Sequence, residues 1–336
     1  MPHELIKKAL LGSGILGLAS RFRENSVAVI MYHSVMDDPS THKHSLGGII
    51  HSSKVFRGQM ELLARDYVPV SLDDVLMFVR GKKQLPRKSV VITFDDGYRD
   101  NFERAMPILN QVGIPATFYV VVECIDQQKL PWPARLRYAF YTTKKKHWLR
   151  DTALELSLST VDEREQAFLQ ASDQCAQLAG ESQERFLRGL EADLEVSPPA
   201  DSRQLMMDWD QVRGLLRGGH TVGSHTMTHP NMAHIGPGDL RTEFAESKQR
   251  LEKELKTRLV HFSYPCPALQ PHWSEESVRI SAEVGYETAV TTNTGTVKRQ
   301  HNALTMRRIL PTKNVEGLRW NLERGYLSSR SEPVTV

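Results

Sequence analysis

The sequence is poor in cysteine, and the few cysteines present form no recognisable pattern. Cys124, Cys175 and Cys266 are odd in number and lie far apart along the 336 residues. This spacing matches neither a cysteine-rich zinc site nor a disulfide framework. It is compatible with a reducing compartment, although many periplasmic proteins also lack disulfides.

A long apolar run is also absent. Residues 9–19 follow Lys7 and Lys8 and form a mildly apolar run that is too short to span a bilayer. Glycines interrupt the run and basic residues follow it, which disfavours a signal peptide, although a cleaved signal sequence stays open. We expect residues 1–25 to form an amphipathic helix with peripheral membrane contact. A cytoplasmic or peripheral inner-membrane location is favoured over a periplasmic or secreted one.

The sequence also lacks a large excess of either positive or negative residues. The chain carries 43 Lys and Arg against 40 Asp and Glu, for a net charge of +3. No basic run is interleaved with aromatic residues, so nucleic acid is not an expected partner. With 40% hydrophobic and 25% charged residues, the composition predicts a soluble globular protein. Its length suits one large domain, with or without an insertion.

What the sequence does contain is an alternation of short β-rich runs with helical patterns, which is typical of parallel βα units. Several of the runs are apolar on both faces, as strands buried inside a barrel are. We therefore predict an α/β barrel over residues 26–330. The predicted strands are Val27–Tyr32, Val90–Phe94, Ala116–Val122, His220–Ser224, His261–Tyr264, Thr288–Thr292 and Thr305–Leu310.

Helix boundaries are indicated by capping residues between these strands. Ser53, Ser71 and Asp239 are each placed to cap the start of a helix. Gly285 is placed where a helix beginning near Glu275 should end, because glycine readily adopts a left-handed backbone conformation.

The segment from about 131 to 202 interrupts the alternation. It contains no strand-like run, and its apolar residues recur at heptad-like spacing behind a capping box of Thr160 and Glu163. We predict a helical insertion. A heptad stripe normally faces a core, which favours a packing element or lid hinge over a wall of the substrate cleft.

Two adjacent carboxylates follow the predicted strand Val90–Phe94. Asp95 and Asp96 would repel one another and raise one pKa unless a cation lay between them. Residues at the carboxyl ends of barrel strands face the side on which barrel enzymes carry out chemistry. The alternative is an ordinary turn, which Asp-Asp-Gly also favours.

Two histidines four residues apart follow the predicted strand His220–Ser224. The spacing of His225 and His229 can bring both imidazoles to one metal ion. Ordinary surface or capping histidines are the alternative. We expect His220, at the other end of this strand, to be structural.

The two signals support one another, because both open on the same face of a parallel barrel. Asp96, His225 and His229 would supply three ligands and leave a position open for water, as in catalytic metal sites. Asp95 would then lie beside that water as a general base. The same face is expected to receive further strand-end residues, namely His33, Tyr264 and Arg308.

These motifs resemble those of the polysaccharide deacetylase family, which has the NodB-homology domain. The run Thr93–Tyr98 is similar to the first motif of the family, and Ser224–His229 is similar to the second. The resemblance implies a distorted (β/α)7 barrel and hydrolysis of N-acetyl groups on amino sugars. It also implies that Asp95 is the base and that Asp96, His225 and His229 hold a divalent ion.

The third motif departs from the common family pattern. Phe262–Pro267 is similar to a subgroup with Phe-Ala-Tyr-Pro-Tyr-Gly, with Cys266 in place of the second aromatic residue and Pro267 in place of glycine. By resemblance, the backbone N–H of Cys266 helps to bind the oxyanion. Arg308 is similar to a late-strand arginine that orients the base, and His33 follows an N-terminal Tyr-His motif as the candidate acid.

The resulting expectation is a hydrolase that removes acetyl groups from a poly- or oligosaccharide, with Tyr98 and Tyr264 contacting the substrate. Zn²⁺ is the first candidate for the metal, and Co²⁺, Ni²⁺ and Fe²⁺ suit the same ligands. Two alternatives stay open. One is a deacetylase or deformylase of a lipid-linked sugar, and the other is a catalytically dead carbohydrate-binding barrel.

Overall fold

The computed structural model describes residues 24–149, 155–199 and 202–328, together with Lys7, Leu10, Leu11 and Ser13. The helix expected over residues 1–25 therefore lies almost entirely outside the described residues. The described helices include no segment with the length and hydropathy that a membrane span requires.

Seven parallel strands form the main sheet, in the order β1-β5-β6-β9-β10-β11-β13. The first and last of them meet through a parallel bridge between Ile30 and Ile309, which nearly closes the sheet into a barrel. Short strands β4 and β12 extend this sheet. The strands are β1 (Ser26–Tyr32), β4 (Val68–Pro69), β5 (Ser89–Phe94), β6 (Ala116–Val120), β9 (Thr221–Ser224), β10 (His261–Ser263), β11 (Thr288–Thr294), β12 (Val297–Lys298) and β13 (Met306–Arg308).

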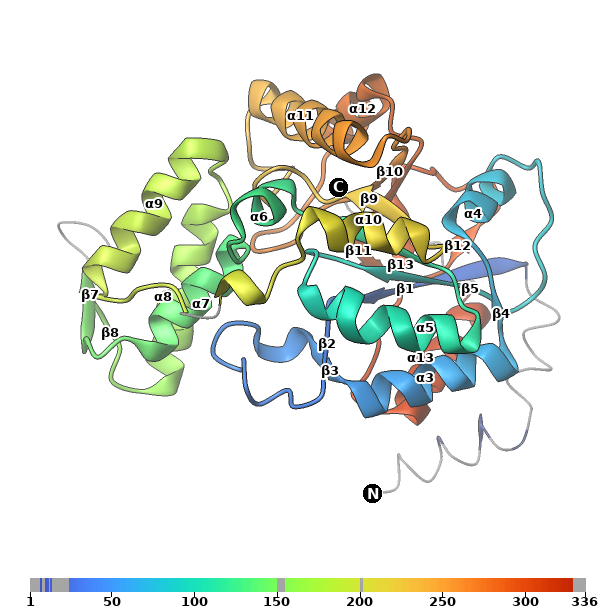
Figure 1. Cartoon of the computed structure of the whole chain (residues 1–336), viewed down its shortest axis with the longest axis horizontal. Coiled ribbons are helices and arrows are strands. Elements are labelled where there is room, and N and C mark those ends of the chain that lie inside the picture. The colour runs from blue at the N-terminus through green and yellow to red at the C-terminus, as the bar shows by residue number, and fades with distance from the viewer. Residues whose placement is uncertain are drawn as a thin grey trace.

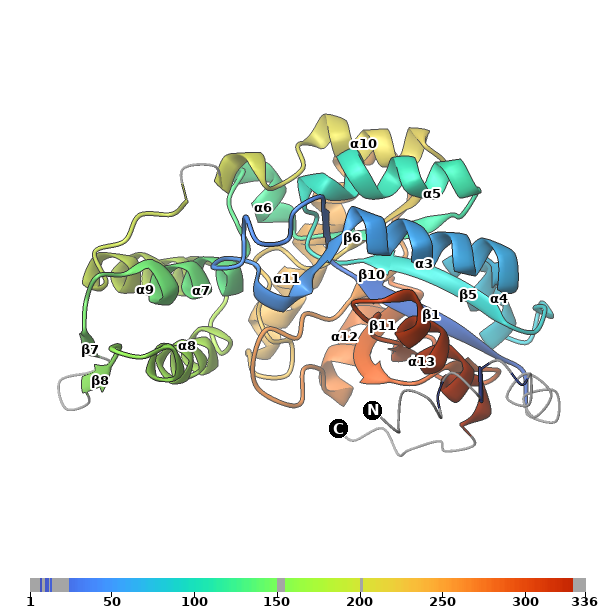
Figure 2. The same cartoon turned by 90° about the horizontal axis from the view of Figure 1, so that it is seen from below.

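All seven predicted strands are present, and the predicted distorted (β/α)7 barrel is confirmed. β1, β5 and β6 are buried along their whole length, because helices cover the sheet outside and side chains fill it inside. Figures 1 and 2 show these helices wrapped around the strands. They are α3 (Ser53–Asp66), α4 (Leu72–Val79), α5 (Met106–Val112), α6 (Val122–Gln127), α10 (Trp209–Arg217), α11 (Pro237–Leu255), α12 (Glu275–Val284) and α13 (Val315–Leu327).

Two of the three predicted N-caps are displaced. Ser71 caps α4 as expected, but Ser52 rather than Ser53 caps α3, because Ser52 ends the short strand β3 (Ile50–Ser52) in an extended conformation. α11 begins at Pro237, ahead of Asp239, since proline is well suited to the first helical position. Gly285 ends α12 with φ of 97°, as predicted.

The helices between residues 132 and 193 form a helical unit beside the barrel mouth, at the left of Figure 1. Its helices are α7 (Trp132–Thr142), α8 (Val161–Cys175) and α9 (Gly180–Asp193), and the capping box of Thr160 and Glu163 is present. The segment also holds an antiparallel pair, β7 (His147–Leu149) and β8 (Glu155–Ser157), although no strand was expected there. Each of these strands has only three residues, too few for a clear alternating pattern.

The helical unit has an apolar core of its own, separate from the barrel core. Trp132, Leu136 and Phe140 of α7 are buried against Ala171 of α8 and Leu187 of α9. Ala171 and Cys175 of the heptad stripe are thus buried within the unit, whereas Phe168 of the same stripe is only partly buried.

Candidate active site

The two carboxylates lie where β5 ends at the barrel mouth. Asp95 and Asp96 are 2% and 6% exposed. Asp96 has a φ of 74° and Gly97 a φ of 86°. A left-handed conformation at an aspartate is strained, and such strain concentrates at functional sites. The turn sends the two neighbouring carboxylates to different partners.

The two histidines lie on the loop after β9 and converge on Asp96. The Nε2 atoms of His225 and His229 are 3.5 and 3.4 Å from the same oxygen, Asp96 Oδ1. One ligand atom from each of the three residues lies within 4.8 Å of the others. Thr226 and His229 have φ values of 72° and 65°, so this loop is strained as well.

This cluster fits a divalent cation. His225 Nδ1 lies 2.8 Å from the carbonyl oxygen of Ser263, and because a carbonyl can only accept, Nδ1 is the donor and Nε2 offers its lone pair. Burial lowers the pKa of His229, which favours the neutral, metal-binding form. Asp96 Oδ1 is buried and has no hydrogen-bond partner among the described residues. Three electron-pair donors that face one another are suited to binding a cation between them.

Asp95 is bound by Arg308 of β13 and is not part of the group of Asp96, His225 and His229, which we call the metal-type cluster. Arg308 is 1% exposed, and its Nη1 and Nη2 donate to Asp95 Oδ1 and Oδ2 at 2.9 and 2.8 Å. Nε donates to the carbonyl of Thr291 at 2.8 Å, which fixes the plane of the guanidinium. Burial alone would raise the pKa of Asp95, but Arg308 and nearby histidines hold it below its usual value. Asp95 is therefore an ionised, oriented carboxylate.

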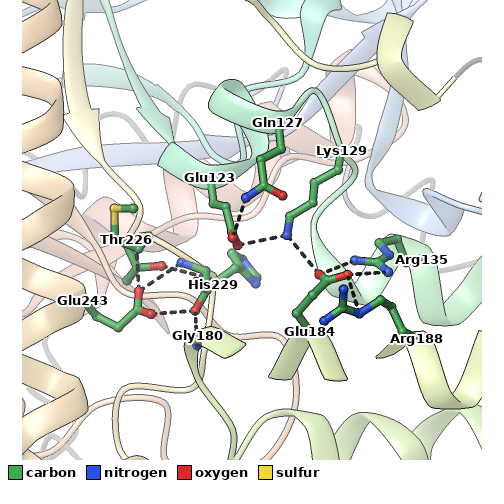
Figure 3. Close-up of polar contacts among 12 residues, drawn as sticks. Glu123, Gln127, Lys129, Arg135, Gly180, Glu184, Arg188, Thr226, His229 and Glu243 are labelled. Atoms are coloured by element: carbon green, nitrogen blue, oxygen red, sulfur yellow. Dashed lines mark hydrogen bonds and ion pairs between the residues drawn. The ribbon is translucent and has the colours of Figure 1, made fainter. Parts of the chain in front are cut away.

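A buried glutamate of α11 binds the loop that carries the two histidines (Figure 3). Glu243 of α11 is 2% exposed, and its Oε2 accepts from the backbone N–H groups of Met227 and Thr228 at 2.7 and 3.0 Å. Its Oε1 accepts from the Thr228 hydroxyl at 2.5 Å. The sequence analysis missed Glu243, since nothing in a charged helix marks one glutamate as buried.

The helical unit contacts the same loop directly. The indole N–H of Trp132 donates to the carbonyl of His229 at 2.7 Å, and the N–H of Gly180 donates to the Thr228 hydroxyl at 3.3 Å. The N–H of Asn231 donates to the carbonyl of Ala176 at 3.2 Å. The unit therefore supports the strained loop as well as packing on itself.

A pocket of about 360 Å³ opens over the cluster. His33, Tyr98 and Cys266 lie in its wall, together with Asp95 and both histidines, as the sequence predicted. Burial and the neighbouring Asp96 raise the pKa of Tyr98 well above its usual value, so its hydroxyl stays protonated. Residues 45–49, which the sequence did not assign to the site, also line the pocket, together with Met31, Pro267 and Thr292. The predicted insertion contributes Pro131, Pro133, Ala134, Arg137 and Phe168, so it forms part of the cleft wall, which is the role that the heptad stripe disfavoured.

Tyr264 does not lie in this pocket, which corrects the expectation that it contacts substrate. Its side chain is fully buried, its ring packs edge-on against Phe262 with centroids 5.1 Å apart, and its hydroxyl lies 3.4 Å from Ser281 Oγ. The ring belongs to the layer between β10 and α12. His220 accepts from the backbone N–H of Ala116 at 3.2 Å, consistent with the structural role expected of it.

The sequence pattern described as Polysaccharide deacetylase matches residues 82–289, more than half of the chain. The chain belongs to the polysaccharide deacetylase family. Membership makes the protein an amide-acting hydrolase of the carbohydrate-deacetylating type, and the family is metal-dependent, in agreement with the Asp96–His225–His229 cluster.

Individual relatives of this deacetylase are distant in sequence. YxkH of Bacillus subtilis (strain 168), grouped by its name with the polysaccharide deacetylases, is 20% identical over 290 residues, 86% of this chain and 72% of YxkH. The poly-beta-1,6-N-acetyl-D-glucosamine N-deacetylase of Escherichia coli (strain K12) is 32% identical over 102 residues, 30% of this chain and 15% of that protein. The Streptococcus pyogenes deacetylase PplD, solved with acetate, superposes with a TM-score of 0.61 at 18% identity, covering 89% of this chain and 99% of PplD.

Proposed function

We propose that this polysaccharide deacetylase hydrolyses N-acetyl groups on amino sugars of a poly- or oligosaccharide and releases acetate, with Asp96, His225 and His229 holding the metal. The observation that carries the proposal is the placement of the ionised Asp95, paired with Arg308, beside the three-ligand cluster at the base of an open pocket. The partial match to a deacetylase named for poly-N-acetylglucosamine supports the same substrate chemistry.

A divalent ion held there, with Zn²⁺ as the first candidate, would polarise the acetyl carbonyl and make a nearby water more acidic. Asp95 is the base that takes the proton of the attacking water. Because Arg308 binds both of its oxygens, Asp95 is ionised and fixed in direction before substrate arrives.

The remaining groups act on the charges that develop during attack. The backbone N–H of Cys266 donates to the oxyanion, a role that the change from an aromatic side chain to cysteine leaves intact. His33 lies in the pocket wall and donates a proton to the leaving amine. The Asn101 amide donates to the His33 carbonyl at 2.6 Å and so holds this residue in place.

The proposal is tested by purifying the protein, determining its bound metal and measuring acetate release from N-acetylglucosamine oligomers with and without a chelator. We expect release that stops with the chelator and returns with Zn²⁺ or Co²⁺. A protein that binds metal but releases nothing from any N-acetylated saccharide, free or lipid-linked, would instead fit the dead carbohydrate-binding barrel. A protein that binds no metal would contradict the role of the cluster.

A further inference from the structure

Arg137 of α7 and Phe168 of α8 line the pocket together with residues 45–49, and the proposed chemistry uses none of them. Lys43, His44 and Tyr141 lie close to Arg137 outside the lining itself. We refer to Lys43, His44, Arg137, Tyr141 and Phe168 as the Arg137 rim.

Arg137 is held in a slot of this rim. Its guanidinium carbon lies 4.4 Å from the centre of the Tyr141 ring and 5.6 Å from that of Phe168. Gly47 covers the other side with φ of 56°, and a Cβ at this position would lie 2.8 Å from Arg137 Nε. Glycine is thus required both for the backbone conformation and for the space that the guanidinium fills.

The positive charge of Arg137 is poorly compensated. Its ion pair with an acid is one 3.5 Å contact from Nη1 to Glu165, a carboxylate that also accepts from the Tyr141 hydroxyl. Arg137 Nε is buried and has no hydrogen-bond partner among the described residues. Arg135, two residues earlier on the same helix, is instead bound by both oxygens of Glu184 and both oxygens of Glu191, at 2.7 to 3.2 Å.

Lys43 adds a second positive charge close to His44. Partial burial lowers the pKa of His44, and so do the charges of Lys43 and Arg137. Among the described residues that line the pocket, Arg137 is the only arginine or lysine, and the acids are Asp95 and Asp96. Asp95 is neutralised by Arg308, and Asp96 lies in the metal-type cluster, so neither is available to compensate the rim.

We propose that the Arg137 rim binds a negatively charged substituent on the sugar chain, so that the substrate class is an anionic N-acetylated saccharide. A guanidinium with free Nη donors is suited to a carboxylate or a phosphate, whose oxygens accept paired hydrogen bonds along its edge. The ring of Phe168, which lines the same pocket, offers an apolar face for the sugar that carries the charge. This inference rests on the proposed function, because it concerns the substrate of the same pocket.

The test measures binding in the metal-loaded Asp95→Asn protein, in which turnover is prevented. The carboxylate arm compares a neutral N-acetylglucosamine oligomer with an oligomer of equal length that alternates N-acetylglucosamine and glucuronate. The phosphate arm compares N-acetylglucosamine with its 1-phosphate. Calorimetric titration is expected to give at least about tenfold tighter binding in one anionic arm, the range of a charge-assisted pair, and a loss of this preference at high salt.

Three substitutions assign the preference to the rim. Arg137→Gln should abolish the anionic preference while leaving binding of the neutral ligand within about twofold. Glu165→Gln should strengthen it, because this change removes the acid that competes for the guanidinium. Arg188→Gln is the matched control, since Arg188 is an exposed arginine of α9 outside the pocket wall and should leave binding unchanged.

The inference is overturned if neither anionic ligand binds more tightly than its neutral counterpart, or if Arg137→Gln weakens neutral and anionic ligands equally. Acetate release by the protein with an unsubstituted Asp95 separates this inference from the proposed function. Release without anionic preference refutes the rim alone, whereas anionic preference with no release from any ligand supports the rim and refutes the deacetylase.

Discussion

The barrel mouth and the helical unit each place an arginine beside the same pocket, but the two arginines are partnered differently. Arg308 donates from all three of its nitrogens to groups in the barrel, including both oxygens of Asp95. Arg137 is stacked on aromatic rings and makes one 3.5 Å contact with Glu165, whose carboxylate is partly exposed. An arginine whose N–H donors are all hydrogen-bonded holds a reacting group in place. An arginine with unused N–H donors can bind a ligand.

The two regions are nevertheless joined at the loop that carries the histidines. Glu243 of the barrel and Trp132 of the helical unit approach this loop from different sides, the first binding Met227 and Thr228 and the second binding the His229 carbonyl. Under the two proposals, the barrel carries out the chemistry and the helical unit selects the substrate, while both support the metal ligands.

The largest expected effect comes from removing the base in the barrel. Asp95→Asn keeps the shape of the side chain but cannot take a proton, so acetate release should fall by at least ~10²-fold. Bound metal should be retained, because Asp95 is outside the three-ligand cluster. Asp173→Asn, at an exposed site on α8, is the matched control. Full activity in Asp95→Asn would remove Asp95 from the mechanism.

The next effect comes from the anchor of the histidine loop. Glu243→Ala removes the acceptor of two backbone N–H groups and one hydroxyl, so metal affinity should fall about 10- to 100-fold, as for other groups that orient metal ligands. Glu246→Ala, at an exposed position of the same helix, should leave affinity unchanged. Competition with a metal indicator measures the metal affinity of both variants. Equal affinities would show that the strained loop holds its shape without Glu243.

The smallest effect tests the link between the two regions. Trp132→Phe keeps an aromatic ring at this buried position but removes the indole N–H and some packing volume, so the free energy of unfolding should fall by about 1–3 kcal/mol. Metal affinity should fall in parallel, since the carbonyl belongs to a ligand residue. Trp148→Phe, in the core of the helical unit, is the comparison. A loss of stability with no change in metal affinity would limit Trp132 to a packing role.

The convergence of Asp95, Asp96 and His225 at the barrel mouth was readable from the sequence because each lies within two residues of the end of a buried strand. β5 leads to Asp95 and Asp96, and β9 leads to His225. Parallel strands must end on the same side, so two local motifs predict a shared site without any knowledge of the intervening chain. Arg308 was placed by the same reasoning on the last strand.

Other parts of the site depend on packing that no local pattern reports. Tyr264 ends a strand as Asp95 does, yet it turns into the layer between β10 and α12, where neighbouring aromatic rings enclose it. Glu243 is one of several acids on a charged helix, and only the approach of the histidine loop makes it buried.

The sequence by itself determined the seven-stranded barrel and the set of residues that converge at its mouth, because strand burial and strand-end position are set over a few neighbouring residues. Only the tertiary structure decided what surrounds that centre. Residues 45–49 and Arg137 are about ninety positions apart in the chain, and they share a pocket wall because α7 begins beside the histidine loop, where Trp132 bonds the His229 carbonyl. Such a wall depends on how the helical unit packs beside the barrel. The hydrophobic periodicity of either segment does not report that packing.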